Sequence, residues 1–168
     1  MYNVSCNMSV TPATTVIEVK NSKNVVINNP SHFDGQSVPF LHSVDYSIAN
    51  ELAIRELIKL SENCRQYVSY HCKNAPLFGD VSNPSGSSWT STKVDGEGHF
   101  YWSNCDIKNN PCNCDGKDKE TVDEGSLTNK QDLPVSTLRF GGYKADSDVS
   151  FTIGDLVCYG GNYVLNIN

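Results

Sequence analysis

The clearest alternation of hydrophobic and polar positions in this chain lies between residues 64 and 74. There, Val68, Tyr70 and Cys72 would share one face of an extended chain, which is the two-residue period of a half-buried β-strand. The pattern predicts a strand that carries a cysteine at each end. Cys64 and Cys72 would then lie about 26 Å apart, whereas the Cα atoms of a disulfide lie roughly 4.4–6.8 Å apart. Each of the two cysteines therefore needs a distant partner.

A second pattern predicts one long helix between residues 43 and 63. Apolar side chains recur there at spacings of three and four, which places them on one face of a helix. Asp45 or Ser47 could cap its start, and Glu51 lies one turn before Arg55, in position for a modest ion pair. The predicted buried face consists of Tyr46, Ala49, Ala53, Leu57, Leu60 and Cys64.

Other parts of the chain predict strands and one long loop. The segment 105–128 has almost no apolar residues, so it is expected to be a surface loop held by sulfur. Shorter runs rich in β-branched residues, bounded by turn-forming residues, predict strands. These strands are expected at residues 14–20, 24–27, 133–140 and 149–157.

Composition narrows the class of protein. The chain has 168 residues, of which 38% are hydrophobic and 19% charged, enough for one domain with a real core and too few for two. It contains seven cysteines, and without a Cys-x-x-Cys pair these favour disulfides over zinc ligation. Disulfides in turn predict an extracellular location. Glycosylation motifs at Asn3 and Asn7 agree with that prediction.

Charge and hydropathy exclude two kinds of partner. A formal charge of −6 and a pI near 5.1 argue against nucleic acid and anionic membranes, because both attract clustered Lys and Arg. No apolar run approaches the roughly 20 residues that cross a bilayer, so we expect no direct membrane insertion by this chain. Residues 1–10 are polar and show no signal peptide. If the cysteines are oxidised, the chain is expected to be a piece of a longer secreted or single-pass membrane protein.

Motifs for catalysis are missing from the sequence. The four histidines are scattered without metal-ligand spacing, and neither Gly-x-Ser-x-Gly nor His-Glu-x-x-His occurs. A catalytic Cys/His pair would need a reduced thiol, which conflicts with the oxidised interpretation. We therefore expect that the protein is not an enzyme.

Two segments remain candidates for binding. The acidic loop at 106–124 could bind calcium through oxygen ligands, although a solvated polar loop is the commoner explanation and no cofactor is predicted. An aromatic run precedes this loop. It could be a recognition patch, because Tyr and Trp dominate interface hot spots, yet alternating aromatic residues on a strand usually pack into a core. The run consists of His99, Phe100, Tyr101 and Trp102.

Several short motifs are weak alone and specific as an ordered set. They are Val-Ser-Cys-Asn-Met-Ser at 4–9, Ser-Glu-Asn-Cys-Arg-Gln at 61–66, Tyr-His-Cys at 70–72, Gly-His-Phe-Tyr-Trp at 98–102, Cys-Asn-Cys-Asp at 112–115, Asp-Leu-Pro-Val at 132–135 and Ile-Gly-Asp-Leu-Val-Cys-Tyr-Gly at 153–160. In this order they resemble the fibrinogen-like domain in the ectodomains of contactin-associated proteins and neurexin IV. Tyr-His-Cys-Lys-Asn at 70–74 also resembles the C-propeptide of fibrillar collagens, a distant member of the same superfamily.

The resemblance implies an α+β fold. Residues 1–168 would form a single disulfide-stapled fibrinogen-like domain, mostly antiparallel sheet with one long helix and long loops. It also implies a disulfide between Cys72 and Cys158. The family's first cysteine lies upstream of the present residue 4, so Cys6, which would bond to it, is expected to be unpaired or externally paired.

The resemblance leaves four cysteines for two further bonds. Cys112 and Cys114 are too close to each other to pair readily. Cys105 is therefore expected to take one of them and Cys64 the other, and which takes which is open.

The function implied is that of a non-catalytic extracellular module of a cell-adhesion receptor or matrix protein. Its expected partners are other cell-surface or matrix glycoproteins. Two alternatives stay open at this point: a lectin-like module that binds glycans or acetyl groups, and a matrix oligomerisation domain. Fold-level analogy does not choose the partner.

Overall fold

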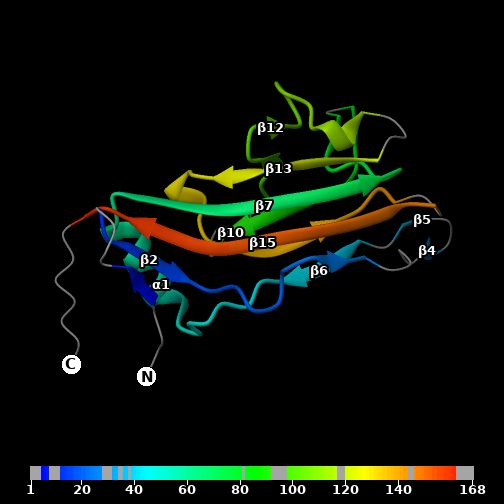
Figure 1. Ribbon diagram of the computed structural model, residues 1–168. Coiled ribbons are helices and arrows are strands. Elements are labelled where there is room, and N and C mark those ends of the chain that lie inside the picture. The colour runs from blue at the N-terminus through cyan, green and yellow to red at the C-terminus, as the bar shows by residue number, and fades with distance from the viewer. Residues whose placement is uncertain are drawn as a thin grey trace.

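A computed structural model describes residues 5–7, 12–27, 32–33, 36–37, 39–80, 82–91, 98–116, 120–143 and 146–161. Among these residues, strands dominate and every strand pair is antiparallel. Figure 1 shows two long strands, β7 and β15, crossing the molecule side by side. The prediction of a mostly antiparallel sheet is confirmed.

The larger sheet contains six of the described strands, in the order β1-β2-β15-β7-β13 with β3 also paired to β15. The central strand β7 is the one predicted from the alternating pattern. The bounds are Ser5–Asn7 for β1, Thr14–Ile17 for β2, Val25–Val26 for β3, Asn63–Lys73 for β7, Thr121–Leu127 for β13 and Asp148–Tyr159 for β15.

A smaller sheet of three described strands has the order β10-β14-β6. Three short hairpins, two 3-10 turns (η1 and η2) and one α-helix complete the regular structure of the described residues. The remaining bounds are Phe40–Ser43 for β6, Ser88–Ser91 for β10, Val135–Phe140 for β14, His32–Phe33 and Gln36–Ser37 for β4 and β5, Gly79–Asp80 and Asn83–Pro84 for β8 and β9, Tyr101–Trp102 and Cys105–Asp106 for β11 and β12, Asn113–Asp115 for η1 and Lys130–Asp132 for η2.

The hydrophobic core lies between the two sheets. Tyr70 of β7 stands opposite Phe151 of β15, and both are buried. Their rings meet Phe140 of β14, with centroids 5.0 and 5.1 Å away. Each such side chain contributes about 1.5–3 kcal/mol by leaving water, so contacts between the sheets fix how β14 sits on the larger sheet.

The helix is shorter than predicted. α1 covers Glu51–Leu60, 10 residues, and is the only α-helix in the described part of the chain. Its start is set by Asn50, whose side chain accepts a hydrogen bond from the Ala53 amide at 3.3 Å. Before it, backbone groups at Asp45 and Ser47 are bonded to residues 20 and 18, so this stretch is extended and neither residue caps the helix.

The predicted buried face of the helix was wrong in part: Tyr46, Leu57 and Cys64 do pack in or against the core, but Ala49, Ala53 and Leu60 are exposed. Ile54 and Ile58 point into the core, whereas Leu60 is 58% exposed. Apolar residues at spacings of three and four occur on more than one face of this short helix. The face that carries Ile54 and Ile58 is the one that packs into the core. The predicted ion pair is confirmed, because Arg55 Nη2 lies 2.6 Å from Glu51 Oε1.

Three disulfides join described cysteines, and they correct the expected pairing of Cys72 with Cys158. Cys158 lies directly opposite Cys64 in the register of β15 and β7, and these two are bonded, with Cα atoms 4.0 Å apart. Cys72 lies opposite Val149, nine positions along β15 from Cys158, or about 30 Å. That distance excludes the expected bond.

The other two bonds hold the loops. Cys72 is bonded to Cys114, and Cys105 is bonded to Cys112. The expectation that Cys105 takes Cys112 or Cys114 is therefore met, while the expectation that Cys64 takes the other is wrong. The side chain of Cys6 lies outside the described residues, so its unpaired or external state remains a prediction.

Two further predictions concern residues that the structure does not describe in full. Asn3 lies outside the described residues, and so does the side chain of Asn7, whose backbone belongs to β1. Their glycosylation remains a prediction. Among the described residues, no helix has the length and apolarity that crossing a membrane requires.

Candidate functional site

The candidate site is the group of loops beside β13, at the top of Figure 1. Two disulfides hold it: Cys72 to Cys114 ties η1 to the central strand, and Cys105 to Cys112 closes the turn after β12. A closed loop of this kind is worth roughly 2–4 kcal/mol in the chain-entropy estimate. The loops therefore have a fixed shape without a large apolar core of their own.

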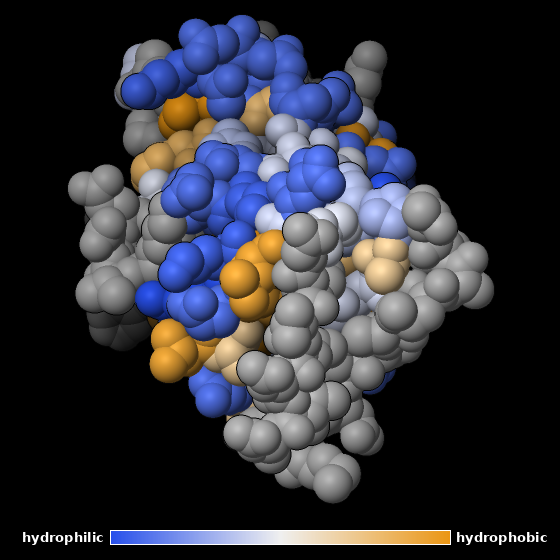
Figure 2. Space-filling view, turned by 90° about the vertical axis from the view of Figure 1, so that its left-hand side faces the viewer, coloured by the Kyte–Doolittle hydropathy of each residue, from blue (hydrophilic) through white to orange (hydrophobic). Residues whose placement is uncertain are grey.

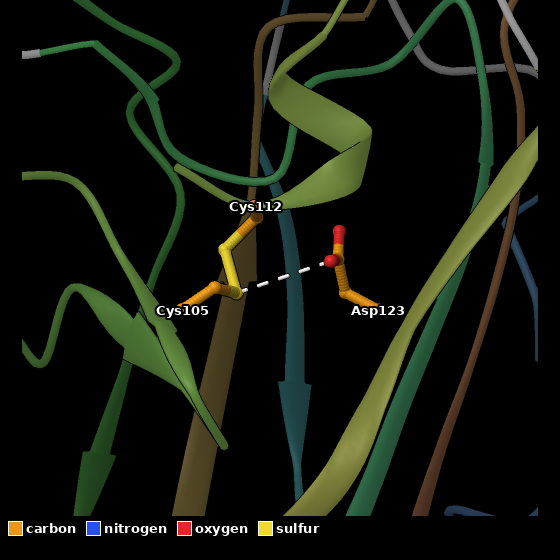
Figure 3. Close-up of side chains that lie close together, drawn as sticks. All are labelled: Cys105, Cys112 and Asp123. Carbon is orange, nitrogen blue, oxygen red and sulfur yellow. Dashed lines mark hydrogen bonds between the residues drawn. A yellow bond between two sulfur atoms is a disulfide. The ribbon is translucent and has the colours of Figure 1, made fainter. Parts of the chain in front are cut away.

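Asp123 anchors η1 from below. Its buried carboxylate accepts hydrogen bonds from the amides of Asn113 and Cys114, both at 2.8 Å. Figure 3 shows this carboxylate beside the Cys105–Cys112 disulfide, with Oδ1 at 3.9 Å from Cys105 Sγ. Since a disulfide sulfur has no hydrogen to donate, that approach is a packing contact. The two amides stabilise the negative charge of Asp123.

The same three residues are the only group of His, Cys, Asp and Glu side chains in the described part of the chain whose ligand atoms lie close enough to hold a metal ion. The sulfurs of Cys105 and Cys112 are bonded to each other. A thiolate is needed to ligate a metal, so this group does not offer two sulfur ligands. Its arrangement serves to hold a loop.

Other carboxylates of the acidic loop also accept backbone amides. Asp106 accepts two at 2.6 Å, from Lys108 and Asn109, and these bonds lower its pKa. Asp115 accepts two at 2.8 Å, from Phe78 and Gly79, while burial raises its pKa. Oxygen atoms that face N–H donors are poorly placed for a cation. Calcium binding was the less favoured interpretation of this loop, no cofactor being predicted, and the contacts of the described residues do not test it.

The aromatic run divides between core and surface. Trp102 is buried, and its indole donates a hydrogen bond to the Asp123 carbonyl at 3.1 Å. Tyr101 is half-buried and donates to Asp132 at 3.0 Å. His99 packs against the buried Trp89 in a tilted arrangement, with ring centroids 4.3 Å apart. This division fits the expectation that aromatic residues on a strand pack at least partly into a core, and a recognition role for the run stays a prediction.

Phe100 is the exposed member of the run. Its side chain is 44% exposed, in contrast to Trp102 at 1%. On the face that Figure 2 shows, the top of the molecule is hydrophilic and apolar residues lie directly below it. A single exposed phenyl ring on a rigid polar surface is a suitable anchor for a protein partner.

Sequence reasoning missed a second feature, a hollow of about 310 Å³ on the outer face of the larger sheet. It was missed because a β-bulge in β15 places its residues together, and the alternating pattern gives no sign of that bulge. The hollow is lined by Arg65, Tyr67, Ser126, Asp155 and Val157.

These features define an antiparallel β-domain with disulfide-held loops. No protein-family model matches the chain. It is 29% identical to neurexin like receptor 1 of Caenorhabditis elegans over 175 residues, covering 93% of this chain and 14% of that protein. It is 29% identical to neurexin-4 of Drosophila melanogaster over 158 residues, covering 80% of this chain and 12% of that protein.

A human protein gives a similar match. The chain is 27% identical to contactin-associated protein 1 of Homo sapiens over 139 residues, covering 73% of this chain and 10% of that protein. The chain thus shows distant homology to contactin-associated proteins and neurexin IV over most of its length. It spans between 10% and 14% of the length of these three relatives.

Proposed function

We propose that this chain is a non-catalytic, protein-binding module in the extracellular part of a cell-adhesion receptor. The observation that carries the proposal is the homology to neurexin-like and contactin-associated proteins across most of the chain. The three disulfides support it independently, because such bonds form and persist outside the reducing cytosol. The expected partners are other glycoproteins of the cell surface or matrix.

The domain type is part of this proposal. We infer that residues 1–168 make one fibrinogen-like domain of a larger secreted or single-pass membrane protein. The ordered motifs that resemble that family support this inference, and so does the contact of both sheets with one core around Tyr70, Phe140 and Phe151. A shared core is what a single domain requires.

Non-catalytic function is supported by the state of the cysteines. The six cysteines whose side chains the structure describes are all in disulfides, so none of these six offers a nucleophilic thiolate. His99 is packed on Trp89 and lies 3.9 Å from Asp132. Its immediate partners are an aromatic ring and a carboxylate that already accepts the Tyr101 hydroxyl.

The proposed contact surface is centred on Phe100. The ring is exposed, and its neighbours in sequence are fixed: Tyr101 by its bond to Asp132 and Trp102 by burial. A partner that covers Phe100 would therefore bury apolar area without paying much conformational entropy. The polar loops around it would form the rim of the interface.

Binding of the purified oxidised chain to cells tests this proposal. The chain, linked artificially into tetramers to increase avidity, should bind cells that display the binding partners of neurexin-like adhesion receptors. Phe100→Ala should weaken this binding by about tenfold or more, as expected for an aromatic hot spot. Leu41→Ala is the matched control, because Leu41 is an exposed apolar residue on β6, 67% exposed. This variant should bind as the unmodified chain does.

Two results would count against the proposal. Failure of the folded, oxidised chain to bind any cell surface or adhesion-receptor ectodomain would remove the adhesion role. Equal binding by the Phe100→Ala and Leu41→Ala variants would move the contact surface away from Phe100.

A further inference from the structure

The hollow on the outer face of the larger sheet is made by three neighbouring strands. Arg65 and Tyr67 come from β7, Ser126 from β13, and Asp155 and Val157 from β15. Its volume of about 310 Å³ is at the lower end of the range for small-ligand sites, roughly 300–1,000 Å³. The hollow is therefore the size of one small ring-shaped ligand.

A β-bulge in β15 gives the hollow its shape. The register with β7 shifts between Ile153 and Leu156, both of which are buried. Two successive residues, Gly154 and Asp155, thus stand between them. A Cβ atom on Gly154 would lie only 3.0 Å from the Cβ of Tyr67, so glycine at this position lets Tyr67 lie close against β15.

Tyr67 is held at both ends: its Cβ lies close against Gly154, and its hydroxyl is hydrogen-bonded. Its hydroxyl donates a 2.5 Å hydrogen bond to Glu124 of β13, and that bond raises the pKa of the phenol. The side chain is nevertheless 41% exposed. An aromatic ring fixed at both ends with an open face is a platform for the C–H face of a ligand.

The polar groups of the hollow are complementary in charge. Asp155 Oδ1 accepts the Val19 amide at 2.9 Å and lies 3.5 Å from Lys23 Nζ. None of the ion pairs formed by the described residues includes Arg65. The guanidinium thus offers donors beside a carboxylate that offers an acceptor, and the two charges nearly cancel.

We propose that this hollow binds one neutral pyranose unit of a glycan. The open ring of Tyr67 would face the C–H groups of the sugar, while Arg65 donates to and Asp155 accepts from its hydroxyl groups. A charged sugar fits less well, because Arg65 and Lys23 offset Asp155 and Glu124 and leave no excess of either charge. A fatty or aromatic ligand fits less well, because Val157 is the one aliphatic side chain that lines the hollow.

The proposed sugar site goes beyond the adhesion role and uses different residues. Phe100 belongs to the disulfide-held loops, whereas the hollow lies on β7, β13 and β15. Loss of one binding activity therefore leaves the other measurable. Because Asp155 is bonded to an amide and a lysine, binding of the sugar needs no calcium.

Titration of the isotope-labelled chain with methyl pyranosides, observed by amide NMR, tests the site. The panel consists of the methyl glycosides of glucose, galactose, mannose and N-acetylglucosamine. At least one should shift the amides of residues 65–67, 126 and 154–157. The Arg65→Ala substitution should weaken binding of that glycoside by about tenfold or more, because a hydrogen bond to a charged group is lost. Arg55→Ala, on α1, should bind the sugar as the unmodified chain does.

Gly154→Ala provides a second probe, since the new Cβ would push on Tyr67. It should also weaken sugar binding, with the rest of the amide spectrum unchanged. The proposal is overturned if none of the four glycosides shifts these amides, or if Arg65→Ala and Arg55→Ala act alike. Binding that EDTA abolishes, or that prefers sialic acid and falls steeply with salt, would overturn it as well.

Discussion

Tyr46 and Tyr70 show how differently a tyrosine hydroxyl can be treated in one core. The Tyr46 hydroxyl donates to the Val135 carbonyl at 2.6 Å and accepts from Gln66 at 2.8 Å. The Tyr70 hydroxyl is buried with no hydrogen-bond partner among the described residues. Burial raises the pKa of both phenols. Both hydroxyls are therefore neutral at physiological pH, and the difference between them lies in hydrogen bonding.

Removal of the two hydroxyls should therefore have different effects on stability. Tyr46→Phe should lower the free energy of unfolding by about 1–3 kcal/mol, because Gln66 and the Val135 carbonyl lose a partner. Tyr70→Phe should leave it unchanged or raise it, since no bond is lost and a buried polar group is removed. Urea unfolding of both variants, followed by tryptophan fluorescence, measures the difference. A larger loss for Tyr70→Phe would show that its hydroxyl has a partner.

Individual carboxylates in the loops were the hardest residues to interpret from sequence. The segment 106–124 has the composition of a solvated or calcium-binding loop. In the structure Asp106, Asp115 and Asp123 each accept two backbone amides. Composition cannot reveal this for Asp115, because the amides of Phe78 and Gly79 come from a segment far away in the sequence, nor for Asp123, because its bonds depend on how β13 lies against η1.

At the scale of elements, strand β7 was predictable and helix α1 was predictable in part. A strand has one period and two faces, so the alternation from 64 to 74 indicated which side chains are buried. A helix with apolar residues at several phases has more than one possible face. The core selected Ile54 and Ile58, and the extended stretch before Asn50 set where the helix begins.

The corrected helix face gives a direct comparison of two substitutions. Ile58→Ala should lower the free energy of unfolding by about 2–5 kcal/mol, because a buried side chain is lost and a cavity remains. Leu60→Ala should change it by less than about 0.5 kcal/mol, because Leu60 is exposed. Thermal unfolding by circular dichroism distinguishes the two. Similar losses would place Leu60 in a packed contact.

The sheet-face hollow marks the limit of prediction from patterns. The outward position of Arg65 and Tyr67 on β7 was readable from the same alternation that puts Val68, Tyr70 and Cys72 on the buried face. Their companion Asp155 was not, because a bulge shifts the register of β15 by an amount that no local pattern indicates. Gly154 is the one local sign, since a strand interior rarely contains glycine without a bulge or a close contact.

For the whole molecule, disulfide pairing depends on which strands are neighbours and in what register. The spacing of the cysteines indicated that Cys64 and Cys72 need distant partners, which is confirmed. It could not indicate that Cys158 stands opposite Cys64, because β7 and β15 are far apart in sequence and their register is set by the core. The resemblance to the fibrinogen-like family suggested the wrong pair, while distant homology to the same relatives holds.

The disulfide pattern is also what links the fold to the proposed function. An extracellular module must reach its folded form with its cysteines oxidised. The loops that carry Phe100 depend on two of the bonds for their shape, and the long strands of the larger sheet are joined by the third. An adhesion surface of this design would be lost on reduction.

Mapping the disulfides by mass spectrometry tests this account most directly. The chain is secreted by animal cells with an added leader peptide, and it is digested without reduction before the peptides are identified. The predicted bonds are Cys64 to Cys158, Cys72 to Cys114 and Cys105 to Cys112. A Cys72–Cys158 bond would contradict the fold. A folded secreted chain in which these six cysteines remain reduced would contradict the extracellular role as well.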